Sequence, residues 1–209
     1  MNAADRIKKN ALFFSILIYY LIGYFLMNEL TARRHVFYHL DLPFEKNIPF
    51  LPALIFAYLL EFAFFVTVYL MVDDLAFFKK IVLSVFICVT LHFVIFAVFP
   101  VEYRLRPDVD PDRGWAYLLV DFYYWLDLPY NCFPSLHVSS VFLISFFMER
   151  FKKGMGWILF PLSFLIAVSV VLVKQHYAAD VVAGMFVGWF VYRQVFGDTS
   201  PALRAPSPY

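Results

Sequence analysis

The sequence is poor in charged side chains and in cysteine. Only 16% of its 209 residues are Asp, Glu, Lys or Arg, whereas 63% are hydrophobic, and the mean hydropathy is +0.72. A soluble domain typically carries about 25% charged residues. The composition therefore excludes an ordinary soluble domain and indicates an integral membrane protein. Two cysteines, Cys88 and Cys132, are too few for a disulfide framework or a cysteine-based metal site.

Long apolar runs account for most of the chain. A helix needs about 20 residues to cross the hydrocarbon core of a membrane. Four runs of this length carry no charge, a fifth is interrupted only by Glu61, and a sixth has Asp180 at its start. We therefore predict an all-α integral membrane protein, a bundle of six transmembrane helices. The predicted spans are Ala11 to Asn28, Ile48 to Val72, Ile81 to Val101, Leu128 to Met148, Gly154 to Val173 and Ala178 to Phe196.

These spans form one predicted membrane domain, residues 1–196. The remaining residues, 197–209, contain three prolines and predict a disordered tail. The longest connection, residues 101–133, lies between the third and fourth spans and is polar at first and then rich in Tyr and Trp. Because these aromatic side chains favour the membrane–water interface, we predict an interfacial segment there.

The distribution of basic residues predicts the orientation of the chain. With a cytoplasmic N-terminus, the inner segments hold ten Lys and Arg residues and the outer segments hold seven. This bias favours both termini on the cytoplasmic side of a plasma or inner membrane. The third-to-fourth and fifth-to-sixth connections then share the non-cytoplasmic face, which brings His137 and His176 to one surface.

His176 and Asp180 are spaced for contact, because residues four apart share one face of a helix. A carboxylate that accepts from one imidazole nitrogen leaves the other nitrogen free to attack. The alternative is a carboxylate that merely stabilises the start of a helix. His137 opens the fourth span after Ser135 and suits a general acid. Alternatively, His137 simply follows a helix start that Ser135 caps.

Three basic residues lie near these histidines in the predicted topology. Arg104 and Arg106 follow the third span, and Lys174 ends the fifth. Guanidinium groups match the geometry of phosphate oxygens, and Lys174 offers a third positive charge. The alternative for the arginines is non-specific contact with lipid headgroups. The alternative for Lys174 is extension towards the headgroups, although its position beside His176 favours phosphate.

In sum these residues resemble the type 2 phosphatidic acid phosphatase superfamily of membrane lipid phosphatases and phosphotransferases. The family has three motifs: Lys followed at a distance by Arg-Pro, Pro-Ser-Gly-His, and Ser-Arg with His-x-x-x-Asp. The matching positions here are Arg106-Pro107; Pro134, Ser135 and His137; and Ser169, His176 and Asp180.

Three positions depart from that pattern. Phe99 and Val170 stand where the family has its Lys and the Arg of the third motif, and Leu136 replaces the Gly of the second. The strings Cys132 to His137 and Lys174 to Tyr177 look more like the inositol phosphorylceramide synthase and sphingomyelin synthase branch. We expect Arg104 and Lys174 to compensate for the missing cations.

The resemblance implies a mechanism without metal or other cofactor. His176 would attack phosphorus with support from Asp180, His137 would protonate the leaving group, and water or an alcohol would resolve the phosphohistidine. Phosphate binding would fall to Arg104, Arg106, Lys174 and Ser135. The implied partners are a lipid phosphate or phospholipid substrate and membrane lipids, with no nucleic acid.

Hydrolysis and headgroup transfer both remain open: the resemblance favours hydrolysis, because many family members of this small size hydrolyse, whereas Leu136 favours transfer. A proton-coupled carrier that uses His176, Asp180 and Glu61 is a second class of function, although the titratable groups cluster at one face and no repeat is visible. A third class is an inactive lipid-binding protein. A carboxylate inside a span, such as Glu61, is itself a functional hypothesis, or it pairs with a Tyr or a backbone group within the bundle.

Overall fold

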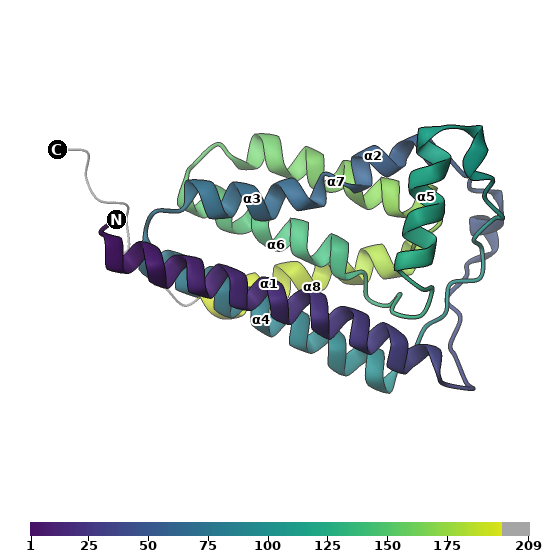
Figure 1. Ribbon diagram of the computed structural model, residues 1–209, viewed down its shortest axis with the longest axis horizontal. Coiled ribbons are helices and arrows are strands. Elements are labelled where there is room, and N and C mark those ends of the chain that lie inside the picture. Colours follow the sequence, from purple (N-terminus) through teal and green to yellow (C-terminus); the bar gives the residue numbers. More distant parts are fainter. Residues whose placement is uncertain (198–209) are drawn as a thin grey trace.

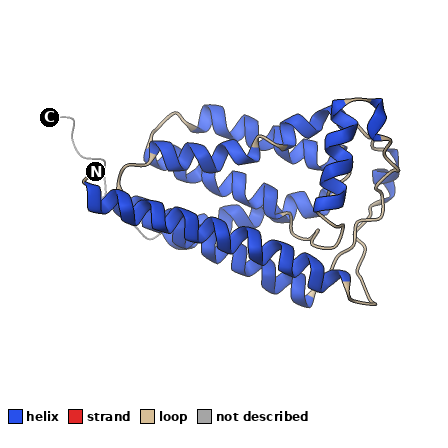
Figure 2. Ribbon diagram, viewed as in Figure 1, coloured by secondary structure: helices blue, strands red, loops and turns tan. Residues whose placement is uncertain are grey.

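The computed structural model describes residues 1–197, and its regular structure there is helical (Figures 1 and 2). Two isolated β-bridges, Tyr38–Val101 and Val101–Asn131, connect the loops at one end of the bundle. Apart from Gly197, the predicted tail lies outside the described residues. The α-helices are α1 (Ala3–Ala32), α2 (Ile55–Tyr58), α3 (Glu61–Met71), α4 (Leu75–Val98), α5 (Trp115–Leu126), α6 (Leu136–Phe151), α7 (Gly156–Leu172) and α8 (Ala178–Phe196). Short 3-10 helices are η1 (Pro43–Asn47), η2 (Pro52–Leu54) and η3 (Pro111–Arg113).

Three helical segments are long and apolar enough to cross a membrane. They are α1, the stretch Pro52–Met71 that contains α2 and α3, and α4. The remaining bundle helices α6, α7 and α8 have 16, 17 and 19 residues. The long apolar segments support a membrane protein, whereas the count of six spans stays a prediction.

The fourth predicted span begins later than the sequence suggests. An uncharged run starts at Leu128, but α6 starts only at Leu136. Pro129 and Pro134 interrupt the run, and proline removes a backbone donor and restricts the preceding residue. Residues 128–135 therefore belong to the connection from α5 to α6. The Ser135 side chain caps α6, because it accepts from the backbone nitrogen of Val138.

Helices α6 and α8 pack very closely because α8 carries two glycines at their interface. A Cβ on Gly184 would lie 2.6 Å from the carbonyl oxygen of Ser135, and one on Gly188 would lie 2.6 Å from that of Ser139. No side chain fits at such distances, so glycine is required at both positions. This contact fixes the start of α6 against the start of α8.

One end of the bundle collects the segments that carry the motifs. Helices α6 and α8 both begin at the end that α5 crosses, opposite the N-terminus of the chain (Figure 1). The segment predicted as interfacial thus contains the helix α5, whose exposed Trp115 and Trp125 point away from the core. Its position relative to a membrane surface remains a prediction.

Candidate active site

Two imidazole rings face each other at this end of the bundle. His137 Nδ1 lies 3.3 Å from His176 Nε2, although the residues are 39 positions apart. His137 is the second residue of α6, and His176 lies in the turn before α8. The site is therefore built by the close contact of α6 with α8, since each helix start delivers one ring.

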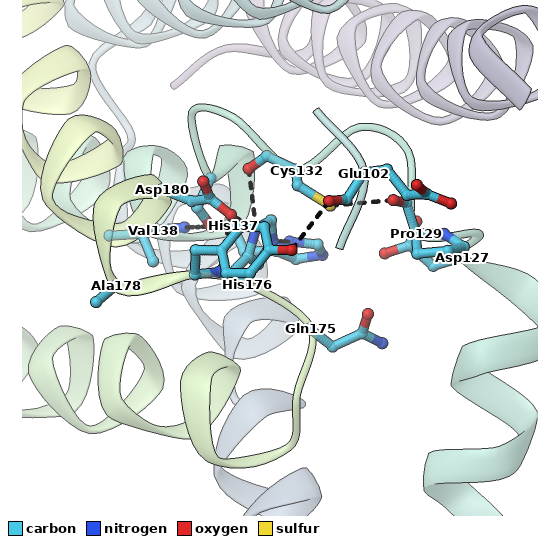
Figure 3. A network of polar contacts seen from close by, with 12 residues as sticks. Glu102, Asp127, Pro129, Cys132, His137, Val138, Gln175, His176, Ala178 and Asp180 are labelled. Carbon is cyan, nitrogen blue, oxygen red and sulfur yellow. Dashed lines mark hydrogen bonds and ion pairs between the residues drawn. The ribbon is translucent and has the colours of Figure 1, made fainter. Parts of the chain in front are cut away.

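Asp180 holds the other side of the His176 ring. Its Oδ2 lies 3.4 Å from His176 Nδ1 and also accepts from the backbone nitrogen of Tyr177 at 2.9 Å. The carbonyl oxygen of Cys132 lies 3.0 Å from the same Nδ1 (Figure 3). His176 precedes α8 instead of sharing a helical face with Asp180, because Tyr177 is the N-cap and Asp180 completes its capping box. Nδ1 thus faces two acceptors, which leaves Nε2 as the nitrogen with a free lone pair.

Ser135, two residues before His137, is completely buried. Its backbone nitrogen donates to the carbonyl oxygen of Asp180 at 3.0 Å, and its side chain caps α6. The first contact attaches the second motif to the third, and the second fixes the start of α6. In this arrangement Ser135 positions the two histidines through the backbone.

The second nitrogen of His137 contacts residues from the α2–α3 segment. Nε2 is hydrogen-bonded to the Tyr58 hydroxyl at 2.7 Å and lies 3.7 Å from Oε2 of Glu61. The Tyr20 hydroxyl donates to the other carboxylate oxygen of Glu61 at 3.2 Å. Of these three residues, only Glu61 could be selected from sequence, because an isolated carboxylate interrupts an apolar run there.

Arg106 is the basic residue whose side chain contacts Gln175 in the turn that carries His176. Its guanidinium donates to Oε1 of Gln175, the residue before His176, and to the carbonyl oxygen of Tyr124. The Tyr124 ring stacks on the guanidinium at 4.4 Å. Arg106 Nε and Gln175 Nε2 are buried donors without a partner among the described residues. Two such donors, one of them charged, are suited to anionic oxygens.

The other two predicted phosphate ligands have different partners. Arg104 is exposed and its Nε donates to Glu102 at 2.8 Å. Lys174 is buried, and its ammonium group donates to the carbonyl oxygens of Ile48 at 2.7 Å and Glu45 at 3.4 Å. Burial lowers the pKa of Lys174. These contacts direct Lys174 towards the loop before η2, away from the two histidines.

Asp127 is a buried carboxylate that sequence reasoning missed. It accepts from the Tyr24 hydroxyl at 2.8 Å and from Asn28 at 3.4 Å. Burial raises the pKa of Asp127, while the nearby Arg106 guanidinium opposes that rise. Asp127 follows α5 directly and has no motif around it, so no sequence signal distinguishes it from the loop acids nearby.

A cavity of about 300 Å³ extends from His137 into the bundle. Tyr58, Glu61 and Asp127 line its polar end. Its remaining walls are overwhelmingly apolar and come mainly from α1, α3 and α4, including Phe13, Leu17, Phe65, Val68, Phe78 and Val85. The apolar lining suits a hydrocarbon chain that ends in a polar group at His137.

Cys132, His176 and Asp180 also bring potential metal-binding atoms within 4.8 Å of one another. However, the His176 and Asp180 atoms concerned already contact each other, and Cys132 Sγ donates to the carbonyl oxygen of Pro129 at 3.4 Å. We assign no metal to this cluster, and chelation tests that choice directly.

The second half of the chain is similar to a known protein family. A family model described as the PAP2 superfamily matches residues 101–200. The matched segment contains both histidines, Asp180 and Arg106.

Two curated proteins are similar to parts of the chain. An uncharacterized protein of Methanocaldococcus jannaschii is 31% identical over 72 residues, which cover 34% of this chain and 30% of that protein. The bacitracin transport permease protein BcrC of Bacillus licheniformis is 38% identical over 73 residues, 35% of this chain and 36% of BcrC. The chain thus spans about a third of the length of these relatives. No solved structure matches it.

Proposed function

We propose that this protein is a membrane lipid phosphatase of the PAP2 superfamily that works through a phosphohistidine. The observation that carries the proposal is the contact between His137 Nδ1 and His176 Nε2, with Asp180 behind His176. Phosphoryl transfer to nitrogen needs a nucleophile, an acid for the leaving oxygen and a group that orients the nucleophile. The three side chains supply these roles in one cluster, in which His176 and Asp180 are buried and His137 is partly exposed.

The reaction has two steps. In the first, the Nε2 lone pair of His176 forms a bond to phosphorus while the bond to the leaving oxygen breaks. Protonated His137 donates its Nδ1 proton to that oxygen, which leaves as an alcohol or, from a diphosphate, as a lipid phosphate. In the second, His137 accepts a proton from water, the water oxygen bonds to phosphorus, and the N–P bond breaks. Inorganic phosphate is released and His137 is protonated again.

Charge stabilisation falls first to Arg106. Phosphoryl transfer depends mainly on positioning and on electrostatic stabilisation of the transferred group. The unpartnered donors Arg106 Nε and Gln175 Nε2 support a phosphate position beside His176. Arg104, Lys174 and Ser135 complete the proposed phosphate-binding set, with Lys174 and Ser135 acting through the loops that they hold.

The cavity supports a lipid substrate. Because its walls are apolar and His137 stands at its polar end, the hydrocarbon part of a lipid phosphate fits there while its phosphate meets the histidines. We propose that this site lies on the non-cytoplasmic face, with both termini in the cytoplasm, and that no metal takes part.

Headgroup transfer is the alternative reaction. It shares the first step and differs only in that an alcohol acceptor replaces water. Leu136, which stands where the family motif has glycine, favours this alternative because it resembles the synthase branch.

The deciding experiment measures phosphate release by the detergent-purified protein from a panel of lipid phosphates and diphosphates in excess EDTA. The proposal expects release by the wild type, none by His176→Ala, and wild-type release by Tyr69→Phe. Tyr69 is a matched control because it bonds Asn10 at the far end of α3. Release that survives His176→Ala would refute the mechanism. Release that EDTA abolishes would refute metal independence. No phosphate release, together with transfer of a labelled phospho-group from the donor lipid to an added alcohol, would establish transfer.

A further inference from the structure

A second carboxylate–histidine pair lies beside the one that includes Asp180. Glu61 Oε2 is 3.7 Å from His137 Nε2, and Asp180 Oδ2 is 3.4 Å from His176 Nδ1. Each ring therefore has one nitrogen facing a carboxylate and one nitrogen facing the other ring. Both carboxylates are buried, Glu61 at 3% exposed and Asp180 at 0%.

The backbone between Tyr58 and Glu61 is shaped to direct both side chains towards His137. Helix α2 ends at Tyr58 and α3 begins at Glu61. Between them the hydrogen bonds tighten to a three-residue spacing, from Leu60 to Ala57 and from Ala63 to Leu60. Residues three apart are eclipsed in a 3-10 turn, so this interruption places Tyr58 and Glu61 on one side.

The contacts of Glu61 favour its action as a hydrogen-bond acceptor. Tyr20 donates to Oε1, which leaves Oε2 for His137. A carboxylate beside an imidazole nitrogen favours a proton on that nitrogen. With its proton on Nε2, neutral His137 keeps the Nδ1 lone pair towards His176, and the protonated ring presents an Nδ1 proton there.

We propose that Glu61 and Tyr58 are positioning residues that hold His137 in the tautomer and charge state required of the acid and base. The inference rests on the proposed phosphatase function. Glu61 exchanges no proton in either step: the Nδ1 proton moves to the leaving oxygen, the Nε2 proton stays between His137 and the α2–α3 segment, and the water proton later returns to Nδ1. The role of Glu61 thus matches that of Asp180, which supports the nucleophile.

Two substrates with the same alkyl chain test the proposal. One is an alkyl phosphate, whose leaving oxygen needs a proton, and the other is the S-alkyl phosphorothiolate, whose leaving sulfur does not. With enzyme in excess, the first-turnover release of alcohol and thiol isolates the first step. We expect Glu61→Gln to slow alcohol release by about a hundredfold, the scale of general-acid catalysis, and thiol release by less than about tenfold. Phosphohistidine should then accumulate from the phosphorothiolate, because the second step also uses His137.

Two further variants keep the test decisive if Glu61→Gln fails to fold. Tyr58→Phe should show the same preference for sulfur with a smaller loss, and Glu61→Asp should recover part of the oxygen-ester rate. Tyr69→Phe, on the same helix, should leave both rates unchanged. Equal losses on both substrates, or no loss on either, would overturn the role of Glu61. Release of alcohol and thiol by His176→Ala would instead show that the proposed function itself is wrong.

Discussion

Arg106 is joined to the turn that carries His176 through Gln175, since its guanidinium donates to the side-chain oxygen of the residue before His176. Arginine is a donor only, so it selects Oε1 and leaves the Gln175 amide with hydrogens to donate. Arg106 also retains a buried Nε without a partner in the described part of the chain. Arg106 and Gln175 thus provide hydrogen-bond donors close to His176. Such donors matter here because Phe99 and Val170 stand where the motifs of the PAP2 superfamily have cations.

The first prediction compares the two arginines. Arg106→Ala should raise KM for a lipid phosphate by about tenfold to a hundredfold, because a charged hydrogen bond to phosphate is worth about 1.5–3 kcal/mol. Gln175→Ala should show a smaller rise. Arg104→Ala should change KM least, since that side chain is exposed and paired with Glu102. Steady-state kinetics checks the order, and a larger effect at Arg104 would assign the phosphate to the other arginine.

The second prediction separates structure from binding at Lys174. Its buried ammonium group holds the carbonyl oxygens of Ile48 and Glu45, and its backbone takes the left-handed φ of 57°. Lys174→Met should therefore lower the free energy of unfolding by about 1–3 kcal/mol, the cost of buried acceptors left unpaired. Thermal unfolding in detergent measures the loss. A KM increase without a change in melting temperature would instead support direct phosphate binding.

The sequence predicted a contact of the site where the two residues lie close together in the chain. The spacing of His176 and Asp180 predicts their contact, and the alternation of spans brings His137 to the same surface. The partners of His137 were not predictable, because Tyr58 is 79 positions away and meets it only through helix packing. The start of α6 was missed because the apolar run continues through Pro129 and Pro134. Asp127 has no pattern around it at all.

The third prediction concerns the interface of α6 and α8. Gly184→Ala places a Cβ against the carbonyl oxygen of Ser135, two residues before His137, so it should reduce both stability and kcat. Gly188→Ala meets the carbonyl of Ser139, one turn further from the site, and should reduce stability with a smaller effect on kcat. Each substitution should cost about 1–3 kcal/mol, as overpacking does. Unfolding curves and kcat per folded molecule test the pair, and an unchanged kcat in Gly184→Ala would contradict the prediction.

The fourth prediction concerns Asp180. Asp180→Asn keeps an oxygen for the Tyr177 backbone nitrogen, so the start of α8 should remain folded. The carbonyl of Cys132 still accepts from His176 Nδ1, which preserves the tautomer, but the negative charge that stabilises the phosphorylated ring is lost. We expect kcat to fall by about a hundredfold or more, the usual scale of a lost electrostatic contact in a transition state. Rapid-quench measurement of phosphohistidine should show slower formation, and unchanged formation would remove Asp180 from the first step.

The cavity walls come mainly from α1, α3 and α4, which precede residue 101, whereas the histidines lie in the segment that the family model matches. The proposed catalytic residues and the proposed lipid-binding walls therefore lie in different halves of the sequence. Substitutions of single apolar side chains in the cavity walls can then change which lipid fits, while the residues proposed for phosphoryl transfer stay the same. A chimera that takes its first hundred residues from one such protein and the rest from another should have the lipid preference of the first parent and the reaction of the second.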